Sequence, residues 1–139
     1  MNERWVGPPQ GSVPLNTEAD IVTARQKGRA MALSLGFSPG DATLIATAIS
    51  ELARNIVAYA KRGEIELLPV ERNGTSGLAV VARDEGDGIP DVRRALQDGY
   101  SSAGRLGLGL PGVKRLMDEL EIVSEVGVGT TVTARKWRV

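Results

Sequence analysis

Three short polar stretches of the sequence carry residues whose types and spacing could do chemistry. Residues 51–55 (ELARN) place a carboxylate and a carboxamide four positions apart. Residues 84–90 (DEGDGIP) set an aspartate before a glycine-rich turn, and residues 104–109 (GRLGLG) form a second glycine-rich segment. Each pattern alone is weak, because glycine loops often arise for structural reasons. Together and in this order they predict a nucleotide pocket with a metal ligand, a base-reading acid and a phosphate-binding loop.

Glu51 and Asn55 lie one turn apart on a predicted helix, about 40° apart around its axis. They flank the apolar stripe of that helix, so both side chains can project into one pocket. The Asn55 carbonyl oxygen could supply one of the hard oxygen ligands that Mg²⁺ requires. Glu51 could then accept a proton from an attacking hydroxyl or water. The alternative is the solvated polar face of an amphipathic helix, which this pair alone would favour.

Asp84 follows a predicted buried strand, where a carboxylate is costly unless it is paired. A carboxylate accepts hydrogen bonds, so it could bind an exocyclic amine such as that of adenine. Gly86 and Gly88 would let the backbone bend and a flat base approach. A plain Asp-x-Gly turn that closes a strand is the alternative. Thr130 begins the last predicted strand, where its hydroxyl could reach the base or its shape could simply favour a strand.

The third stretch leads into a predicted helix. Consecutive N–H groups in such a loop can bind an anion, and the helix N-terminus adds its dipole. No Gly-Lys-Ser/Thr closes the loop, so it is not a Walker A motif. A surface loop ahead of a helix is the alternative, although long loops with no core residues are more often functional. The candidate phosphate ligands are the loop glycines and nearby donors: Ser101, Ser102, Gly104, Arg105, Gly107 and Gly109.

The elements that must position these residues follow from periodicity, caps and turn residues. A capping box at residues 17–20 begins a helix that Gly36 ends, and Ser38 caps a second helix that ends at Gly63. Pro69 suggests an edge strand or a bulge. The other predicted elements are an edge strand near 12–15, strands at 65–70, 78–83, 121–126 and 130–137, a short helix at 92–96, a loop at 98–109 and a helix at 110–120. Their order predicts an α+β sandwich, with helices on one face of a mixed, largely antiparallel sheet.

Composition limits the function further. Seventeen basic and seventeen acidic residues balance, so no overall field favours nucleic acid or an acidic membrane. The sequence shows no apolar run long enough to span a bilayer and no signal peptide, which makes a cytoplasmic location the expectation. It contains no cysteine and no histidine, which excludes thiolate, zinc-cysteine and Ser-His-Asp chemistry and a histidine phosphoacceptor. We expect a flexible Pro/Gly-rich leader over residues 1–16 and one domain over residues 17–139.

The motifs resemble the N, G1, G2 and G3 boxes of the GHKL (Bergerat-fold) ATP-binding family. Within that family they are most similar to the RsbT-type serine/threonine kinases of the bacterial stressosome. The resemblance covers residues 17–137, and its motifs are specific. The segments that carry it are 49–55 (ISELARN), 84–91 (DEGDGIPD), 98–102 (DGYSS) and 107–119 (GLGLPGVKRLMDE).

The resemblance implies ATP and Mg²⁺ as cofactors and assigns roles by position. It makes Asn55 the Mg²⁺ ligand, Glu51 the general base and Asp84 the adenine reader. Gly86 and Gly88 would shape the adenine pocket, the loop glycines would hold the phosphates, and Thr130 would lie near the base.

It also implies a protein serine/threonine kinase that acts by partner switching in the general stress response. Such kinases phosphorylate STAS-domain scaffold or antagonist proteins and, when released, activate a serine phosphatase. One alternative is an anti-sigma factor kinase that binds sigma directly, although those proteins often carry a histidine after the N-box asparagine. A non-catalytic, ATP-gated binding module is another. The protein substrate, the signal and the oligomeric state are not determined by the sequence.

Overall fold

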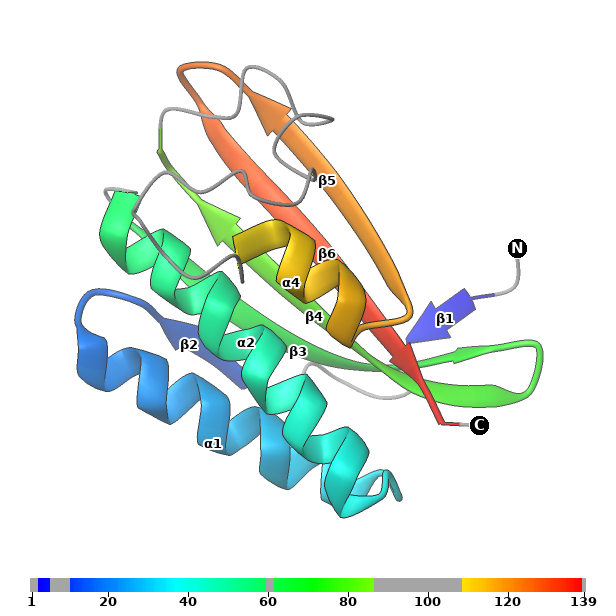
Figure 1. Cartoon of the computed structure of the whole chain (residues 1–139). Helices are drawn as coiled ribbons and strands as arrows, with labels where there is room; N and C mark the ends of the chain where they lie inside the picture. Colours follow the sequence, from blue (N-terminus) through cyan, green and yellow to red (C-terminus); the bar gives the residue numbers. More distant parts are fainter. Residues whose placement is uncertain (1–2, 6–10, 60–61, 87–108, 139) are drawn as a thin grey trace.

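Six strands form one sheet, and helices cover one of its faces (Figure 1). The computed structural model describes residues 3–5, 11–59, 62–86 and 109–138. The strand order is β1-β3-β4-β6-β5, with β2 also on β3, and every pair of neighbouring strands among the described residues is antiparallel. The predicted α+β class is confirmed. In chain order the elements are β1 Glu3–Trp5, β2 Gly11–Pro14, α1 Glu18–Ser34, α2 Pro39–Tyr59, β3 Gly63–Arg72, β4 Thr75–Asp84, α4 Gly109–Leu116, β5 Glu119–Glu125 and β6 Gly129–Trp137.

The first two helices begin where their caps predict. The Thr17 N–H donates to Asp20 Oδ2 at 3.0 Å, and the Asp41 N–H donates to Ser38 Oγ at 3.1 Å. Backbone hydrogen bonds from Asn16 and Thr17 lower the pKa of Asp20. Gly36 follows α1 with φ +93°, a conformation that glycine adopts without strain. These local contacts explain why both N-terminal boundaries could be read from the sequence.

The predicted helix over residues 110–120 is wrong over its last four residues. The helix α4 ends at Leu116, and β5 begins at Glu119. The Asp118 N–H donates to the Arg135 carbonyl at 2.9 Å, and Leu120 pairs with Ala134 of β6. An apolar residue at position 120 reaches the core from a helix or from a strand, so pairing with β6 decides between them.

The N-terminal part of the chain differs from the loose leader that we expected. Its described residues form β1 and β2, which both pair with β3, and β2 matches the predicted edge strand. Trp5 pairs with Val70 and Gly11 with Leu67. Pro69 therefore lies between the two segments, where no described residue pairs with it on that side. A proline fits there because it has no N–H to give to a neighbouring strand.

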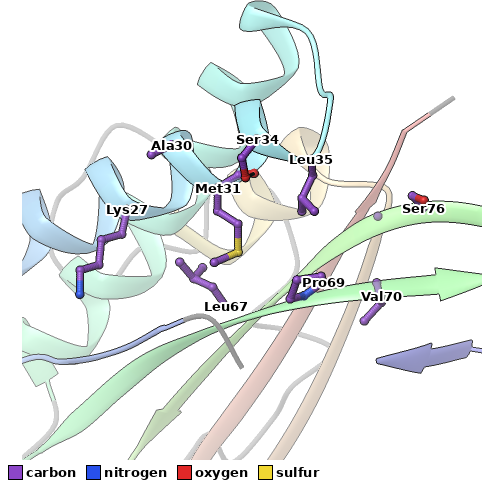
Figure 2. Close-up of a pocket in the computed structure, with 10 residues that line it drawn as sticks. Lys27, Ala30, Met31, Ser34, Leu35, Leu67, Pro69, Val70 and Ser76 are labelled. Carbon is purple, nitrogen blue, oxygen red and sulfur yellow. Dashed lines mark hydrogen bonds between the residues drawn. The ribbon is translucent and has the colours of Figure 1, made fainter. Parts of the chain in front are cut away.

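A groove of about 680 Å³ lies between α1 and the sheet (Figure 2). Lys27 and Met31 line it from the helix, and Leu67 and Pro69 line it from β3. On β4 it reaches Ser76 and Gly77, near the start of that strand. Asp84 ends the same strand, seven residues or about 23 Å of extended chain beyond Gly77.

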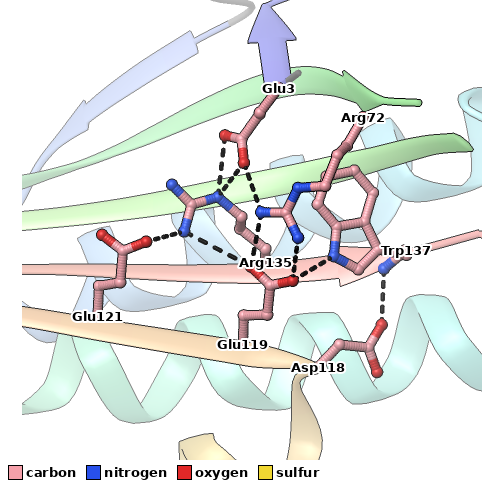
Figure 3. A network of polar contacts seen from close by, with 7 residues as sticks. All are labelled: Glu3, Arg72, Asp118, Glu119, Glu121, Arg135 and Trp137. Atoms are coloured by element: carbon pink, nitrogen blue, oxygen red, sulfur yellow. Dashed lines mark hydrogen bonds and ion pairs between the residues drawn. The ribbon is translucent and has the colours of Figure 1, made fainter. Parts of the chain in front are cut away.

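The strand β1 is held to the sheet by a network of ion pairs (Figure 3). Glu3 accepts hydrogen bonds from Arg72 and Arg135, each at 2.9 Å. Arg72 also binds Glu119 and lies over the Trp137 ring, 4.6 Å from its centroid. The Arg72 and Arg135 side chains are only 18% and 13% exposed. One cluster therefore joins β1, β3, β5 and β6.

The substitution Arg72→Met should lower the free energy of unfolding by about 1–3 kcal/mol, because it removes one of the two arginines that bind Glu3 and the nearer of the two that bind Glu119. Arg4→Met is the matched control. Its partner is Glu71 at 2.9 Å, but the Arg4 side chain is 73% exposed, so its loss should stay below about 1 kcal/mol. Urea unfolding at pH 7 measures both, and equal losses would contradict a structural role for this cluster.

The pH dependence of the same variants is a second measurement. The hydrogen bond from Arg72 holds the pKa of Glu119 below its ordinary value, and the Trp137 indole adds to this effect. A carboxyl with a lowered folded-state pKa stabilises the fold above its unfolded-state pKa and loses that contribution as the pH falls. The stability gap between wild type and Arg72→Met should therefore narrow on acidification below about pH 4.5.

Candidate nucleotide-binding site

A row of four residues crosses the sheet at one end. Gly63 of β3 pairs with Asp84 of β4, Asp84 pairs with Thr130 of β6, and Thr130 pairs with Ser124 of β5. Side chains two positions apart on a strand share a face. The neighbours two positions inward all belong to the core between helices and sheet or pack against it: Ile65, Ala82, Ile122 and Val132. The row therefore lies on the face of the sheet that carries the helices.

The Asp84 carboxylate is fixed by two backbone amides. The N–H groups of Gly86 and Thr130 both donate to Oδ1, at 3.0 and 3.2 Å. Among the described residues no hydrogen-bond donor is found for Oδ2. Burial raises the pKa of Asp84, and the two amide hydrogen bonds oppose that rise. The carboxylate thus has one oxygen held in place and one able to accept a hydrogen bond from a ligand.

Two glycines bring backbone close to Asp84. Gly129 has φ +154°, and a Cβ added there would lie 2.0 Å from the Asp84 carbonyl oxygen. A Cβ on Gly63 would lie 2.5 Å from the Arg83 carbonyl oxygen and 2.5 Å from Ile56 Cγ2. Ile56 follows Asn55 on α2, so Gly63 is the point where this end of the helix packs against the row. The structure thereby brings the first two polar stretches of the sequence together.

Glu51 and Asn55 lie on this part of α2. Glu51 is only 4% exposed, which rules out the solvated helix face as an account of this residue. Its Oε2 accepts a hydrogen bond from Arg54 Nη1 at 2.8 Å, and Arg54 is 45% exposed. Asn55 is half-buried. A buried carboxylate one turn from a half-buried amide is costly for a helix to retain, which fits a functional position.

The described residues contain no group of three or more carboxylates that could hold a metal ion. Asn55 can supply one neutral oxygen. This donor set fits Mg²⁺, which commonly binds through one or two protein ligands together with substrate phosphates and water. It does not fit a metal held by protein alone.

Several predicted residues lie outside the described part of the chain. These are Gly88, Ser101, Ser102, Gly104, Arg105 and Gly107, together with the predicted short helix at 92–96 and all but the last residue of the predicted loop at 98–109. Gly109 is described and begins α4. A Cβ there would meet only Pro111 Cδ, at an ordinary 3.8 Å. Packing within the described structure therefore does not require glycine at position 109.

Sequence reasoning missed Ser124, Gly63 and Gly129 as members of the site. A signal for Ser124 was present. The turn at residues 126–128 pairs Glu125 with Gly129 and then Ser124 with Thr130. Counting back across that turn would have placed the serine opposite the predicted threonine. The contacts of Gly63 with α2 had no such signal, because they join segments that the sequence does not relate.

Comparisons with known proteins agree with this geometry. Residues 14–136 match the model of the histidine kinase-like ATPase domain. Serine/threonine-protein kinase RsbT of Bacillus subtilis (strain 168) is 53% identical over 128 residues, which cover 92% of this chain and 96% of that protein. The anti-sigma F factor of Geobacillus stearothermophilus is 32% identical and covers 81% of each chain. That of Halalkalibacterium halodurans is 33% identical and covers 69% of each chain.

The α+β sheet with helices on one face fits the family whose model matches residues 14–136. This chain belongs to the histidine kinase-like ATPase family, and it therefore binds ATP. Within the family it is a homologue of the serine/threonine-protein kinase RsbT. No helix in the described part of the chain is long and apolar enough to cross a membrane.

The close packing at Gly63 gives a testable expectation. Gly63→Ala should lower the free energy of unfolding by about 1–3 kcal/mol, since the added methyl group overlaps backbone as well as Ile56. Gly40→Ala is the matched control, because its Cβ would meet only Ser38 Oγ at 3.9 Å, and alanine favours the helix. Thermal unfolding and nucleotide titration of both variants measure the effect. A Gly63→Ala protein with wild-type stability and affinity would show that this contact does not shape the site.

Proposed function

We propose that this chain transfers the γ-phosphoryl group of ATP to a serine or threonine hydroxyl of a partner protein. The observation that carries the proposal is 53% identity to RsbT over nearly the whole length of both chains. That homology implies that the chain works with partner-switching proteins. The anti-sigma F factors are less similar and cover less of the chain, so direct binding of sigma is the second candidate.

In such a transfer, each residue of the candidate site would have a separate role. Asp84 Oδ2 and Thr130 would bind the base, and Asn55 would hold Mg²⁺ through its side-chain oxygen. The metal ion supplies neutralisation of charge on the phosphates. The carboxylate of Glu51 would accept the proton of the attacking hydroxyl. Arg54 binds Oε2 of this carboxylate, so the proton would go to Oε1 or Arg54 would move away. The buried position of Glu51 supports this assignment, because a buried base keeps bulk water away from the reacting group.

The partners follow from the same homology. We propose STAS-domain scaffold or antagonist proteins as substrates, and a serine phosphatase as the protein that the released kinase activates, in the cytoplasm. The chain contains no histidine and no cysteine. A phosphohistidine or thiol relay within the given sequence is therefore impossible, and the acceptor that we propose is a hydroxyl of the partner protein.

Two substitutions on α2 should separate metal binding from proton transfer. Asn55→Ala should weaken Mg²⁺-dependent ATP binding and phosphoryl transfer together. Glu51→Gln keeps the size of the buried side chain, so ATP affinity should change little while transfer slows about 100-fold or more, the usual effect of removing a general base. Calorimetry and single-turnover transfer measure the two quantities. The exposed carboxylate of Glu18 provides the control Glu18→Gln, and wild-type transfer by Glu51→Gln would remove Glu51 from the mechanism.

The activity itself is tested with radiolabelled ATP, Mg²⁺ and purified STAS-domain proteins from the same organism. We expect acid-stable, alkali-sensitive label on a STAS-domain protein, and none with Asn55→Ala. A parallel pull-down should recover that protein or a serine phosphatase. If the STAS-domain proteins stay unlabelled and a sigma factor binds tightly instead, the second candidate function is correct. ATP-dependent binding of a STAS-domain protein without label would indicate a nucleotide-gated binding module.

A further inference from the structure

We propose that Ser124 is a positioning residue that sets the base specificity of the site without touching the nucleotide. It does so by making the Thr130 hydroxyl a hydrogen-bond acceptor beside Asp84. The pocket then selects a purine that carries an amino group at C6 over one that carries an oxygen there. This inference rests on the proposed binding of ATP at the Asp84 row, and it deepens that proposal by naming a specificity-determining residue.

Ser124 stands out in the pattern of its strand. The inward positions of β5 before it are Leu120 and Ile122, and those of β6 after Thr130 are Val132 and Ala134, all packed in or against the core. At the end of the two strands this apolar face gives way to a pair of hydroxyls, which lie directly opposite each other. Thr130 is only 7% exposed. A buried hydroxyl needs a partner, and Ser124 Oγ provides it at 2.8 Å from Thr130 Oγ1.

The Gly129 carbonyl favours one direction for this hydrogen bond, which either hydroxyl could donate. Ser124 Oγ also donates to the Gly129 carbonyl oxygen, at 3.3 Å. A hydroxyl has one hydrogen to donate, and a carbonyl oxygen can only accept. When Ser124 donates to Gly129, the 2.8 Å contact requires the Thr130 hydroxyl to donate to Ser124. Thr130 Oγ1 is then left with lone pairs and no hydrogen for a ligand.

The result is two acceptors side by side on neighbouring strands. Asp84 pairs with Thr130 in register, and the Thr130 N–H holds Asp84 Oδ1 at 3.2 Å. Asp84 Oδ2 and the Thr130 hydroxyl oxygen can then both accept a hydrogen bond from a ligand. The C6 amino group of adenine offers two N–H groups, whereas the C6 oxygen of guanine or hypoxanthine offers none and would face two acceptors.

The alternative is that the two hydroxyls only stabilise the hairpin, as cross-strand Ser–Thr pairs do elsewhere. The two accounts differ in what removal of the Ser124 hydroxyl does. A structural pair would weaken every nucleotide equally. A positioning residue would release the Thr130 hydroxyl to rotate and donate into the pocket, which favours an oxygen at C6.

The test compares ATP with inosine triphosphate, which carries oxygen at C6, by calorimetry with Mg²⁺ and no partner protein. Wild type should bind ATP at least about 10-fold more tightly. In Ser124→Ala that ratio should fall by about 3- to 10-fold, the usual effect of one hydrogen bond. Ser124→Thr keeps the hydroxyl and should restore the ratio. Thr133→Ala is the control, because Thr133 lies three residues further along β6 with its side chain on the opposite face.

A double-mutant cycle distinguishes an effect of Ser124 through Thr130 from a general loss of folded structure. Thr130→Val removes the hydroxyl that Ser124 is proposed to orient, so adding Ser124→Ala to Thr130→Val should leave the ratio unchanged. The proposal is overturned if Ser124→Ala keeps the wild-type ratio, if it weakens both nucleotides equally, or if wild type does not prefer ATP. None of these measurements uses phosphoryl transfer. A chain that binds ATP selectively but transfers nothing would fail the proposed function and leave this inference standing.

Discussion

The candidate site depends on the hydrogen bonds that hold the Asp84 carboxylate in place. It ends the central strand β4, and both of its anchoring hydrogen bonds come from backbone, at Gly86 and Thr130. Backbone donors do not rotate away, so the carboxylate is positioned before any ligand arrives. Gly129 and Gly63 make this possible, because a side chain at either position would overlap the backbone beside Asp84. The geometry of the site is thus a consequence of close strand packing rather than of flexible side chains.

Placing the site at the end of the sheet separates it from the network that holds the sheet together. Arg72, Arg135 and Glu3 join four strands on the face away from the helices, as strand alternation from the core residues requires. The core between helices and sheet is apolar, and its polar exceptions lie toward the site, at Ser50, Glu51 and Thr130. The ion-pair network and the candidate site therefore lie on different faces and at different ends of one sheet.

The absence of histidine and cysteine from the sequence has a mechanistic consequence. The groups that could take part in phosphoryl transfer here are oxygens, amides, ammonium groups and guanidinium groups. Catalysis in such a site depends on positioning and on charge neutralisation, with a carboxylate as the base. In the proposed mechanism, the buried placement of Glu51 and the pairing of Asp84 with amides therefore matter more than the intrinsic reactivity of any one side chain.

The sequence by itself determined the local features. Caps at Thr17 and Ser38 and the glycine after α1 depend on residues a few positions apart, and the helix boundaries read from them agree with the structure. The polar stretches around Asn55 and Asp84 are local sequence patterns of the same kind. Tertiary structure decided the rest. Leu120 became part of a strand because β6 offered a pairing partner, and residues 3–5 and 11–14 joined the sheet because β3 had a free edge. Ser124 lies in the candidate site because it pairs with Thr130 of β6. Gly63 lies there because it pairs with Asp84 of β4 and packs against Ile56 of α2. Contacts of this kind depend on how distant segments meet, which local propensity does not encode.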